Sequence, residues 1–525
     1  SASKIYKAPT LQELAANADK SNEMIKDDLQ KSLNEAERLK KELEEIKKSL
    51  YDKEKPDWQD KNKLEQFLQN QNALQQNIEK LKQENLKSQQ EKNQFNQMSQ
   101  EILDKQEMLN KLFEELMNDE MKELYKELQK MMEEMNKNQL LNQMEKIEMS
   151  QEQVSKELDR ALEQFKQLQM DEKLQSISDQ LKELSEKQEQ LAEDTKNKEK
   201  SNFDLNKEQE KLKEEYNKLR DQLDELHELN ESLENKRNLE KTDEMEQQIA
   251  EEMKKSSEEL GENKNKKASE SQKSAAEKME ELAQKMEEMK TKDQEEQAQE
   301  DMDSLRQLIE NLINFSIEQE DVMTQFRSTA ANDPKYVKLG QRQRKLKDDA
   351  QMLEDSLFAL SKRIMQLGPF INKEVAEMNQ NIGKSMKFIT ERQTPMVMSN
   401  QQYVMTSVNN LALLFDEAMK QMQEQMKNSQ PGSGSCSKPG GSGKPSPGAG
   451  KMSMQEMQKQ LQEQMEKMKE AMEKGNKPGG KEDGEKGDGG KKPGDGKTPG
   501  QGGTNPAEGG MGNMPGMSQQ LAEMA

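Results

Sequence analysis

The sequence predicts an all-α protein with long antiparallel coiled-coil hairpins, a C-terminal helical bundle and a disordered Gly/Pro-rich tail. Three observations carry this prediction. Only 30% of the 525 residues are apolar, while 35% are charged and 3% aromatic, a composition that suits long helices. Apolar residues recur at alternating steps of three and four over most of the first 427 positions, which places them along one helix face. Of the 27 glycines, 23 lie from Gly432 onward.

The charge and the reactive groups of the chain exclude several classes of function and of site. Asp and Glu outnumber Lys and Arg by 103 to 81, and the resulting net charge of −22 argues against binding to nucleic-acid phosphates. The single histidine, His227, and the single cysteine, Cys436, exclude a Cys/His zinc cluster or a disulfide within the chain. Neighbouring carboxylates are typical of solvated helix faces with Lys partners. We therefore expect no enzyme activity, no cofactor and no metal site.

Residues 1–118 are predicted to form an N-terminal helical hairpin. The apolar positions from Ile25 to Leu50 alternate between steps of four and three, which gives the first helix a single apolar stripe. Pro56 marks the turn, because proline lacks a backbone N–H and restricts the residue before it. The apolar spacing then continues to about Met117 as a second long helix. Two long helices joined by a short turn favour antiparallel packing.

Residues 119–300 are predicted to form an extended coiled-coil arm. The three-and-four spacing restarts at Met121 and is still present at Met289. Two stretches interrupt it. Residues 138–150 indicate a turn, since Ser150 and Gln153 form a capping box for a helix that follows. Residues 235–272 lose the apolar stripe, which favours a loop or a frayed helix.

Residues 301–428 are predicted to form the C-terminal helical bundle. Six of the 11 phenylalanines lie between positions 305 and 427, and the apolar spacing from Leu346 to Leu367 is the most regular in the chain. Sharp proline-containing breaks separate four helices with short connections. Because aromatic residues bury more apolar area, we expect this bundle to be the most stable part of the chain. The predicted turn and hinge positions of the whole chain are Pro56, Pro334, Gly368, Pro369 and Pro395.

Residues 429–525 are predicted to be a low-complexity disordered tail, since a Gly/Pro-rich stretch buries too little surface to offset its chain entropy. Within it, residues 453–474 predict a short Met-rich helix, which either docks a partner groove or folds back on the helical part, or else stays a marginal amphipathic helix. Its candidate interaction residues are Met454, Met457, Leu461, Met465, Met468 and Met472. Cys436, also in the tail, is either an idle thiol or a crosslink between two chains.

Five stretches of the sequence resemble one protein family. They are residues 5–11 (IYKAPTL), 25–29 (IKDDL), 57–61 (DWQDK), 345–349 (KLKDD) and, as the most specific, 400–413 (NQQYVMTSVNNLAL). They are similar to the C-terminal helical region of the large membrane-anchored Bacteroidota envelope proteins that are catalogued as a domain of unknown function. The resemblance implies a place on the periplasmic side of the inner membrane. It also implies that membrane contact belongs to a segment N-terminal to this chain, and it assigns no catalytic residue.

The sequence and the resemblance together lead to one functional expectation and one alternative. The expectation is a non-enzymatic scaffold of the bacterial cell envelope, a periplasmic helical arm that mediates protein–protein interaction or self-association through its heptad stripes. The alternative is a holdase-like periplasmic chaperone that grips unfolded clients with Met-rich helical stripes, because methionine adapts to many surfaces. The chain contains no run of about 18 apolar residues, so we expect no signal or membrane-spanning segment within it.

Overall fold

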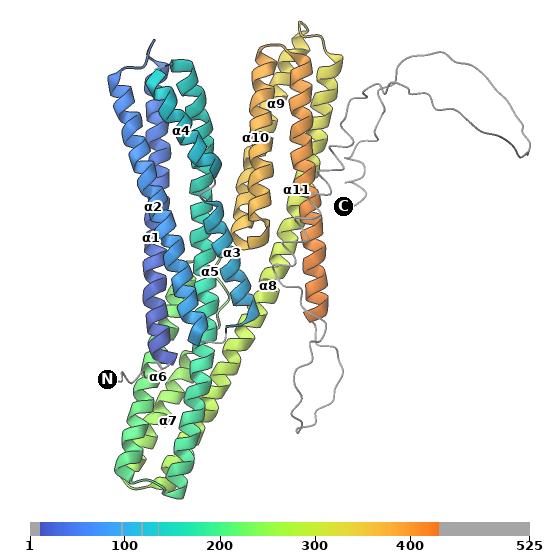
Figure 1. The fold of residues 1–525 in the computed structure, drawn as a ribbon. Coiled ribbons are helices and arrows are strands. Elements are labelled where there is room, and N and C mark those ends of the chain that lie inside the picture. Colours follow the sequence, from blue (N-terminus) through green and yellow to red (C-terminus); the bar gives the residue numbers. More distant parts are fainter. Residues whose placement is uncertain (1–10, 96–97, 117–118, 135, 430–525) are drawn as a thin grey trace, which may run out of the picture. The chain divides into compact units, whose positions relative to one another are not determined.

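The structure is a computed structural model that describes residues 11–95, 98–116, 119–134 and 136–429, and this part of the chain is all-α, as predicted (Figure 1). Within these ranges no strand is present. The helices are α1 (Leu11–Tyr51), α2 (Trp58–Phe95), α3 (Gln100–Glu115), α4 (Asp119–Glu134), α5 (Lys137–Asn197), α6 (Asn202–Glu231), α7 (Asp243–Gly261), α8 (Asn265–Ser328), α9 (Pro334–Arg363), the 3-10 helix η1 (Met365–Leu367), α10 (Gly368–Thr390) and α11 (Thr394–Ser429).

The described residues divide into two compact units. Unit 1 contains the residues up to Ser304, the segment Asp355–Asn372 and the end of α11 from Met422. Unit 2 contains Leu305–Glu354 and Lys373–Gln421. No helix in the described ranges is long and apolar enough to cross a membrane.

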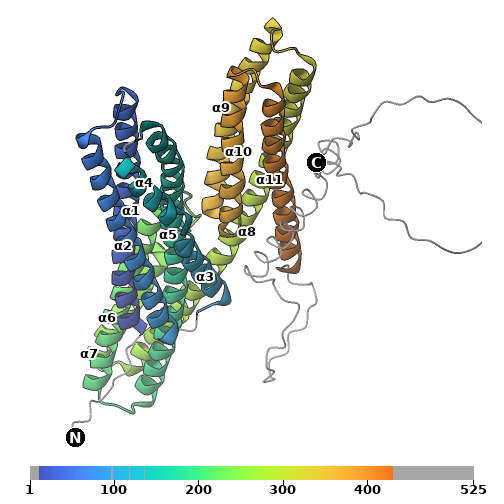
Figure 2. The same cartoon turned by 45° about the horizontal axis from the view of Figure 1, so that its top comes forward.

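In the first part of unit 1, α1 packs against both α2 and α5, and α3 and α4 also pack on α5 (Figures 1 and 2). The stripe predicted for the first helix is its buried face, with Leu29, Leu39 and Leu43 all fully buried. Pro56 lies in the connection between α1 and α2. Asp57 caps α2, because the backbone N–H groups of Gln59 and Asp60 donate to its Oδ1 at 2.8 and 3.0 Å.

Two helix boundaries predicted in this region are wrong. The expected single helix from position 58 to 117 is two helices, because Ser99 is the N-cap of α3 and its side chain accepts from Ile102 N. The expected turn at 138–150 is helix, since α5 begins at Lys137 with Asn136 as its N-cap. Between its polar residues this stretch carries an apolar face, which is buried in the structure. The face consists of Leu140, Leu141, Met144 and Ile147.

The second part of unit 1 consists of α6, α7, the C-terminal half of α5 and the first half of α8, around a shared apolar cluster. The expected loop or frayed helix over 235–272 is correct for residues 235–242 and for the turn at 262–264, but wrong for the remainder, which contains α7 and the start of α8. Its apolar positions are sparse, but Ile249, Met253 and Leu260 are buried by neighbouring helices. Tertiary packing thus stabilises a helix whose own stripe is weak.

Unit 2 contains the second half of α8, most of α9 and α10, and most of α11. Pro334 is the first residue of α9 and Pro395 the second of α11, positions where a missing N–H costs no helical hydrogen bond. The interior of the unit also holds a polar layer. Gln343 Nε2 donates to Gln319 Oε1 at 2.8 Å, and Gln401 Nε2 donates to Gln343 Oε1 at 2.7 Å. Such a layer favours one helix register, since a shifted register would leave the buried amides unpaired.

Candidate functional site

The middle of α5 is the most unusual part of unit 1, because it is charged and yet buried on all sides. Segments from α1, α3, the connection between α6 and α7, and residues 355–372 contact it. Buried polar residues are normally paired, so the partners of this stretch define the site. The buried polar residues of α5 in this stretch are Glu157, Arg160, Glu163, Gln164, Gln167, Gln169, Asp171, Glu172 and Lys173.

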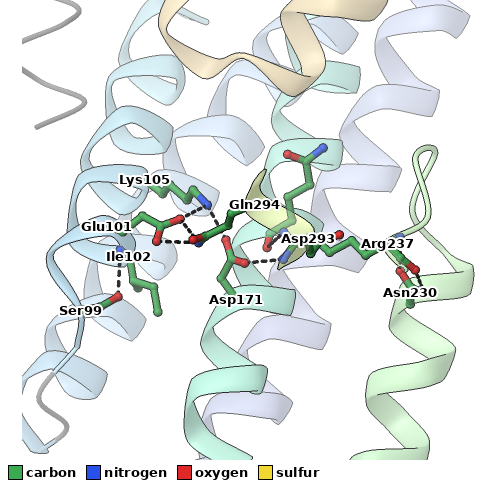
Figure 3. A network of polar contacts seen from close by, with 10 residues as sticks. Ser99, Glu101, Ile102, Lys105, Asp171, Asn230, Arg237, Asp293 and Gln294 are labelled. Atoms are coloured by element: carbon green, nitrogen blue, oxygen red, sulfur yellow. Dashed lines mark hydrogen bonds and ion pairs between the residues drawn. The ribbon is translucent and has the colours of Figure 1, made fainter. Parts of the chain in front are cut away.

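One group of contacts centres on Asp171, whose side chain is 1% exposed (Figure 3). Its Oδ2 accepts from Lys105 Nζ of α3 at 2.7 Å, and its Oδ1 accepts from Arg237 Nη1 at 2.5 Å. Lys105 Nζ also reaches Glu101 at 2.8 Å, and Arg237 Nε lies 3.6 Å from Asp293 Oδ2 of α8. We call these five residues the Asp171 cluster. It connects α3, α5, α8 and the connection between α6 and α7 through buried charges.

The Asp171 cluster keeps its central groups ionised. Burial alone would raise the pKa of Asp171, but the nearby Lys105 ammonium and Arg237 guanidinium outweigh it and hold that pKa well below its usual range. Burial alone would lower the pKa of Lys105 and of Arg237, but the Asp171 carboxylate raises both. Each charge therefore stabilises the other, and removing one leaves the remainder buried without compensation.

The connection between α6 and α7 is fixed to α5 through Arg237. Arg237 N donates to Asn230 Oδ1 at 2.7 Å, and Asn230 Nδ2 donates to Arg237 O at 2.9 Å, so the end of α6 holds its backbone on both sides. Arg237 Nη2 also donates to the backbone oxygen of Gln167 at 3.3 Å. Sequence reasoning missed this residue. The only available signal was one arginine within a stretch that has no apolar stripe.

A second group of contacts, the Arg160 cluster, joins α5 to residues 355–372. Arg160 is 1% exposed, and its Nη1 donates to both carboxylate oxygens of Glu157 at 2.9 and 2.7 Å. Its Nε donates to Ser361 Oγ at 3.0 Å and its Nη2 to Asn372 Oδ1 at 2.8 Å. The guanidinium carbon lies 5.7 Å from the centre of the Phe358 ring. All donor groups of this arginine thus face partners that fix its orientation.

Gly368, a predicted hinge, takes part in the Arg160 cluster. A Cβ at this position would lie 2.7 Å from Arg160 Nη1, closer than real contacts allow. Glycine is required here by the close approach of the arginine and not by the backbone conformation, because φ at Gly368 is −49°, a value that any residue can adopt. Pro369 follows it in the first turn of α10.

The other candidate residues of the sequence lie elsewhere. The six Met-rich positions of segment 453–474 and Cys436 are outside the described residues. His227 is half-buried on α6, and no described group of three or more His, Cys, Asp or Glu could hold a metal ion. The residues that the structure brings together are therefore those of the two ionic clusters. In the sequence these residues look like the charges of solvated helix faces.

The chemistry of the two clusters suits a structural role, in which they hold several helices together. Their cations and carboxylates are matched in pairs, with hydrogen bonds to the remaining donors. Buried ion pairs contribute little net stability compared with apolar packing, but breaking one partner is costly. Such clusters accordingly select one arrangement of the helices over others.

The ion pair between Asp301 of α8 and Arg363 of α9 predicts a pH-dependent stability within unit 1. Asp301 Oδ1 lies 3.0 Å from Arg363 Nε. Burial raises the pKa of Asp301 to about 6, although Arg363 opposes the shift. The folded state then binds more protons than the unfolded chain between pH 3.8 and about 6, so this group lowers stability as pH rises through that window.

We therefore expect Asp301→Asn to gain stability relative to the wild type as pH rises from 4 to 7, because asparagine does not ionise. Urea denaturation of both proteins across this range measures the difference. Asp221→Asn, at an exposed position of α6, is the matched control and should show no comparable trend. A constant difference between Asp301→Asn and the wild type at every pH would contradict the prediction.

Comparison with known proteins found no relative of this chain. No protein-family model, no curated protein and no solved structure matches it.

Proposed function

We propose that this chain is a non-enzymatic scaffold of the bacterial cell envelope, a helical arm on the periplasmic side of the inner membrane that binds other proteins or a second copy of itself. The observation that carries the proposal is the pair of ionic clusters around the middle of α5. They join elements up to about two hundred positions apart in the sequence into one arrangement. The envelope location rests on the sequence resemblance carried most specifically by residues 400–413.

In this proposal the mechanism is geometric. Antiparallel coiled-coil hairpins supply distance, and the ionic clusters hold the hairpins in one arrangement. The heptad stripes pack against one another within the chain, so the outer surface of the packed helices meets the partner. The Gly/Pro-rich tail, taken as disordered, extends the volume that the arm can search. Ordered surfaces bind more tightly than mobile ones because less conformational entropy is lost on association.

The holdase alternative has less support from the described residues. Met279, Met286 and Met289 form the methionine stripe of α8, and all three are buried against neighbouring helices. Methionines in a packed core offer no surface to an unfolded client. A scaffold can bind through the ordered, polar outer surface of packed helices and needs no exposed methionine stripe, so we favour it.

Crosslinking with mass spectrometry in envelopes of the native host tests the scaffold proposal. We expect reproducible crosslinks from exposed lysines of the arm to a small set of envelope proteins or to a second copy. Asp171→Ala should reduce them because it loosens the arrangement of α3, α5 and α8, whereas the surface control Asp221→Ala should retain them. Crosslinks that are equally abundant in both variants would contradict the geometric mechanism.

A light-scattering assay with a heat-aggregating client separates the two functions. If the chain is a scaffold, we expect it not to suppress aggregation of the client when the two proteins are present in equimolar amounts. Suppression that is lost when Met454, Met457 and Met465 are replaced by glutamine would instead support the holdase. Protease protection of the chain in intact cells, with digestion only after the outer membrane is opened, tests the periplasmic location independently.

A further inference from the structure

A groove runs along the outside of unit 1 between α2 and α4. It has a volume of about 560 Å³ and is bounded by positions 61–75 of α2 and 122–133 of α4. Leu68, Tyr125 and Met132 form the apolar part of its lining, while amides and charged side chains form the rest. At a rise of about 1.5 Å per residue, the α2 side of the groove is roughly 21 Å long.

One residue of this lining, Gln71, has a buried amide oxygen without a hydrogen-bond partner. Gln71 of α2 is 2% exposed, and its Oε1 has no hydrogen-bond partner. Buried polar atoms are nearly always paired, so Gln71 can gain a hydrogen bond if its side chain turns toward a donor in the groove. In contrast, the neighbouring Tyr125 hydroxyl is satisfied, since it donates to Gln151 Oε1 at 3.0 Å.

We propose that this groove is the docking site of the chain's own segment 453–474. The segment carries a single apolar stripe whose members are spaced 3, 4, 4, 3 and 4 residues apart, from Met454 to Met472. As a helix that stripe would be roughly 27 Å long, enough to cover the groove from end to end. Methionine suits a lining of mixed shape and polarity because its side chain is unbranched and polarizable.

The segment also supplies what the orphaned oxygen lacks. Five glutamines lie within it, at positions 455, 458, 460, 462 and 464. Those at 458 and 464 flank the apolar stripe, where an amide can donate to Gln71 Oε1. Both surfaces mix cations and carboxylates: the groove has Lys61 and Lys126 near Glu65 and Glu133, and the segment alternates Glu and Lys. Neither surface therefore repels the other by net charge.

The chain outside the described residues gives the segment a long reach within one molecule. Twenty-three residues, 430–452, connect the end of α11 to the segment, and they span up to about 76 Å when extended. A tethered segment faces its site at an effective concentration of roughly millimolar, so modest intrinsic affinity is enough for occupancy. We accordingly infer docking within one chain rather than between two.

Hydrogen exchange of the full-length chain tests the proposal. In the stripe variant Met457→Gln/Leu461→Gln/Met465→Gln we expect exchange over residues 61–75 and 122–133 to be at least about fivefold faster than in the wild type, because an undocked segment no longer covers them. The matched control Lys459→Gln/Glu463→Gln/Glu466→Gln makes three changes on the opposite face of the segment. It should exchange at the wild-type rate. Equal exchange in the stripe variant and the wild type would overturn the proposal.

A crosslink identifies the occupant directly. In a Cys436→Ser background, cysteines at Gln129 on the groove and Gln462 in the segment are joined with a short bismaleimide. We expect a crosslink within one chain, and none when the groove cysteine is moved to Asp221 on α6. Crosslinked dimers, or equal yields at both positions, would show that another molecule or chance contact accounts for the product and would overturn docking within the chain.

Discussion

Replacing Asp171 with alanine is expected to lower the free energy of local unfolding around the middle of α5 by about 3–5 kcal/mol. The substitution leaves Lys105 and Arg237 buried without the carboxylate that both of them contact. It also releases Arg237 and with it the connection between α6 and α7 from α5. Native-state hydrogen exchange of peptides that cover residues 157–173 measures the change.

The matched control for this prediction is Asp221→Ala, at an exposed position of α6, which should change stability by no more than about 0.5 kcal/mol. The effect of Asp171→Ala should also shrink in acid. A carboxylate whose folded pKa is lowered contributes stability above its unfolded pKa, near 3.8, and loses that contribution as pH falls toward the folded value. A decrease in the free energy of local unfolding of less than about 1 kcal/mol at pH 7 would show that the Asp171 cluster does not hold these helices together.

Phe326→Ala is expected to destabilise unit 2 by about 3–5 kcal/mol, because it removes a fully buried ring and leaves a cavity. Phe326 lies near the end of α8, and its ring meets that of Tyr336 in α9 edge to face, with centroids 5.0 Å apart and planes at 79°. The substitution therefore weakens the packing between the two helices next to their turn. Hydrogen exchange over residues 320–345 reports this loss.

Phe203→Ala provides the control with identical chemistry. Phe203 is 79% exposed at the start of α6, so its truncation should cost no more than about 0.5 kcal/mol. A double-mutant cycle of Phe326→Ala with Tyr336→Leu isolates the ring pair, for which we expect a coupling of about 0.5–1.5 kcal/mol. Equal costs for the buried and the exposed phenylalanine would mean that unit 2 does not pack as described.

The helices themselves could be predicted where the signal is local. The stripe from Ile25 to Leu50 is the buried face of α1, and proline positions mark the starts of α9 and α11. These signals depend on a few neighbouring residues, since a missing N–H or a three-and-four spacing acts within one or two turns. The same reasoning failed for α7, whose sparse apolar residues form a helix only because other helices cover them.

The sequence by itself determined that this chain is helical and where most of its apolar stripes lie. Only the tertiary structure decided which charged residues are buried. Asp171 meets Lys105 from 66 positions away, and Arg160 meets Ser361 from 201 positions away. In the sequence these residues look like any of the chain's many solvated charges. The identity of a charge is local, but its burial and its partner depend on which distant segments pack against it, and a one-dimensional spacing pattern does not encode that.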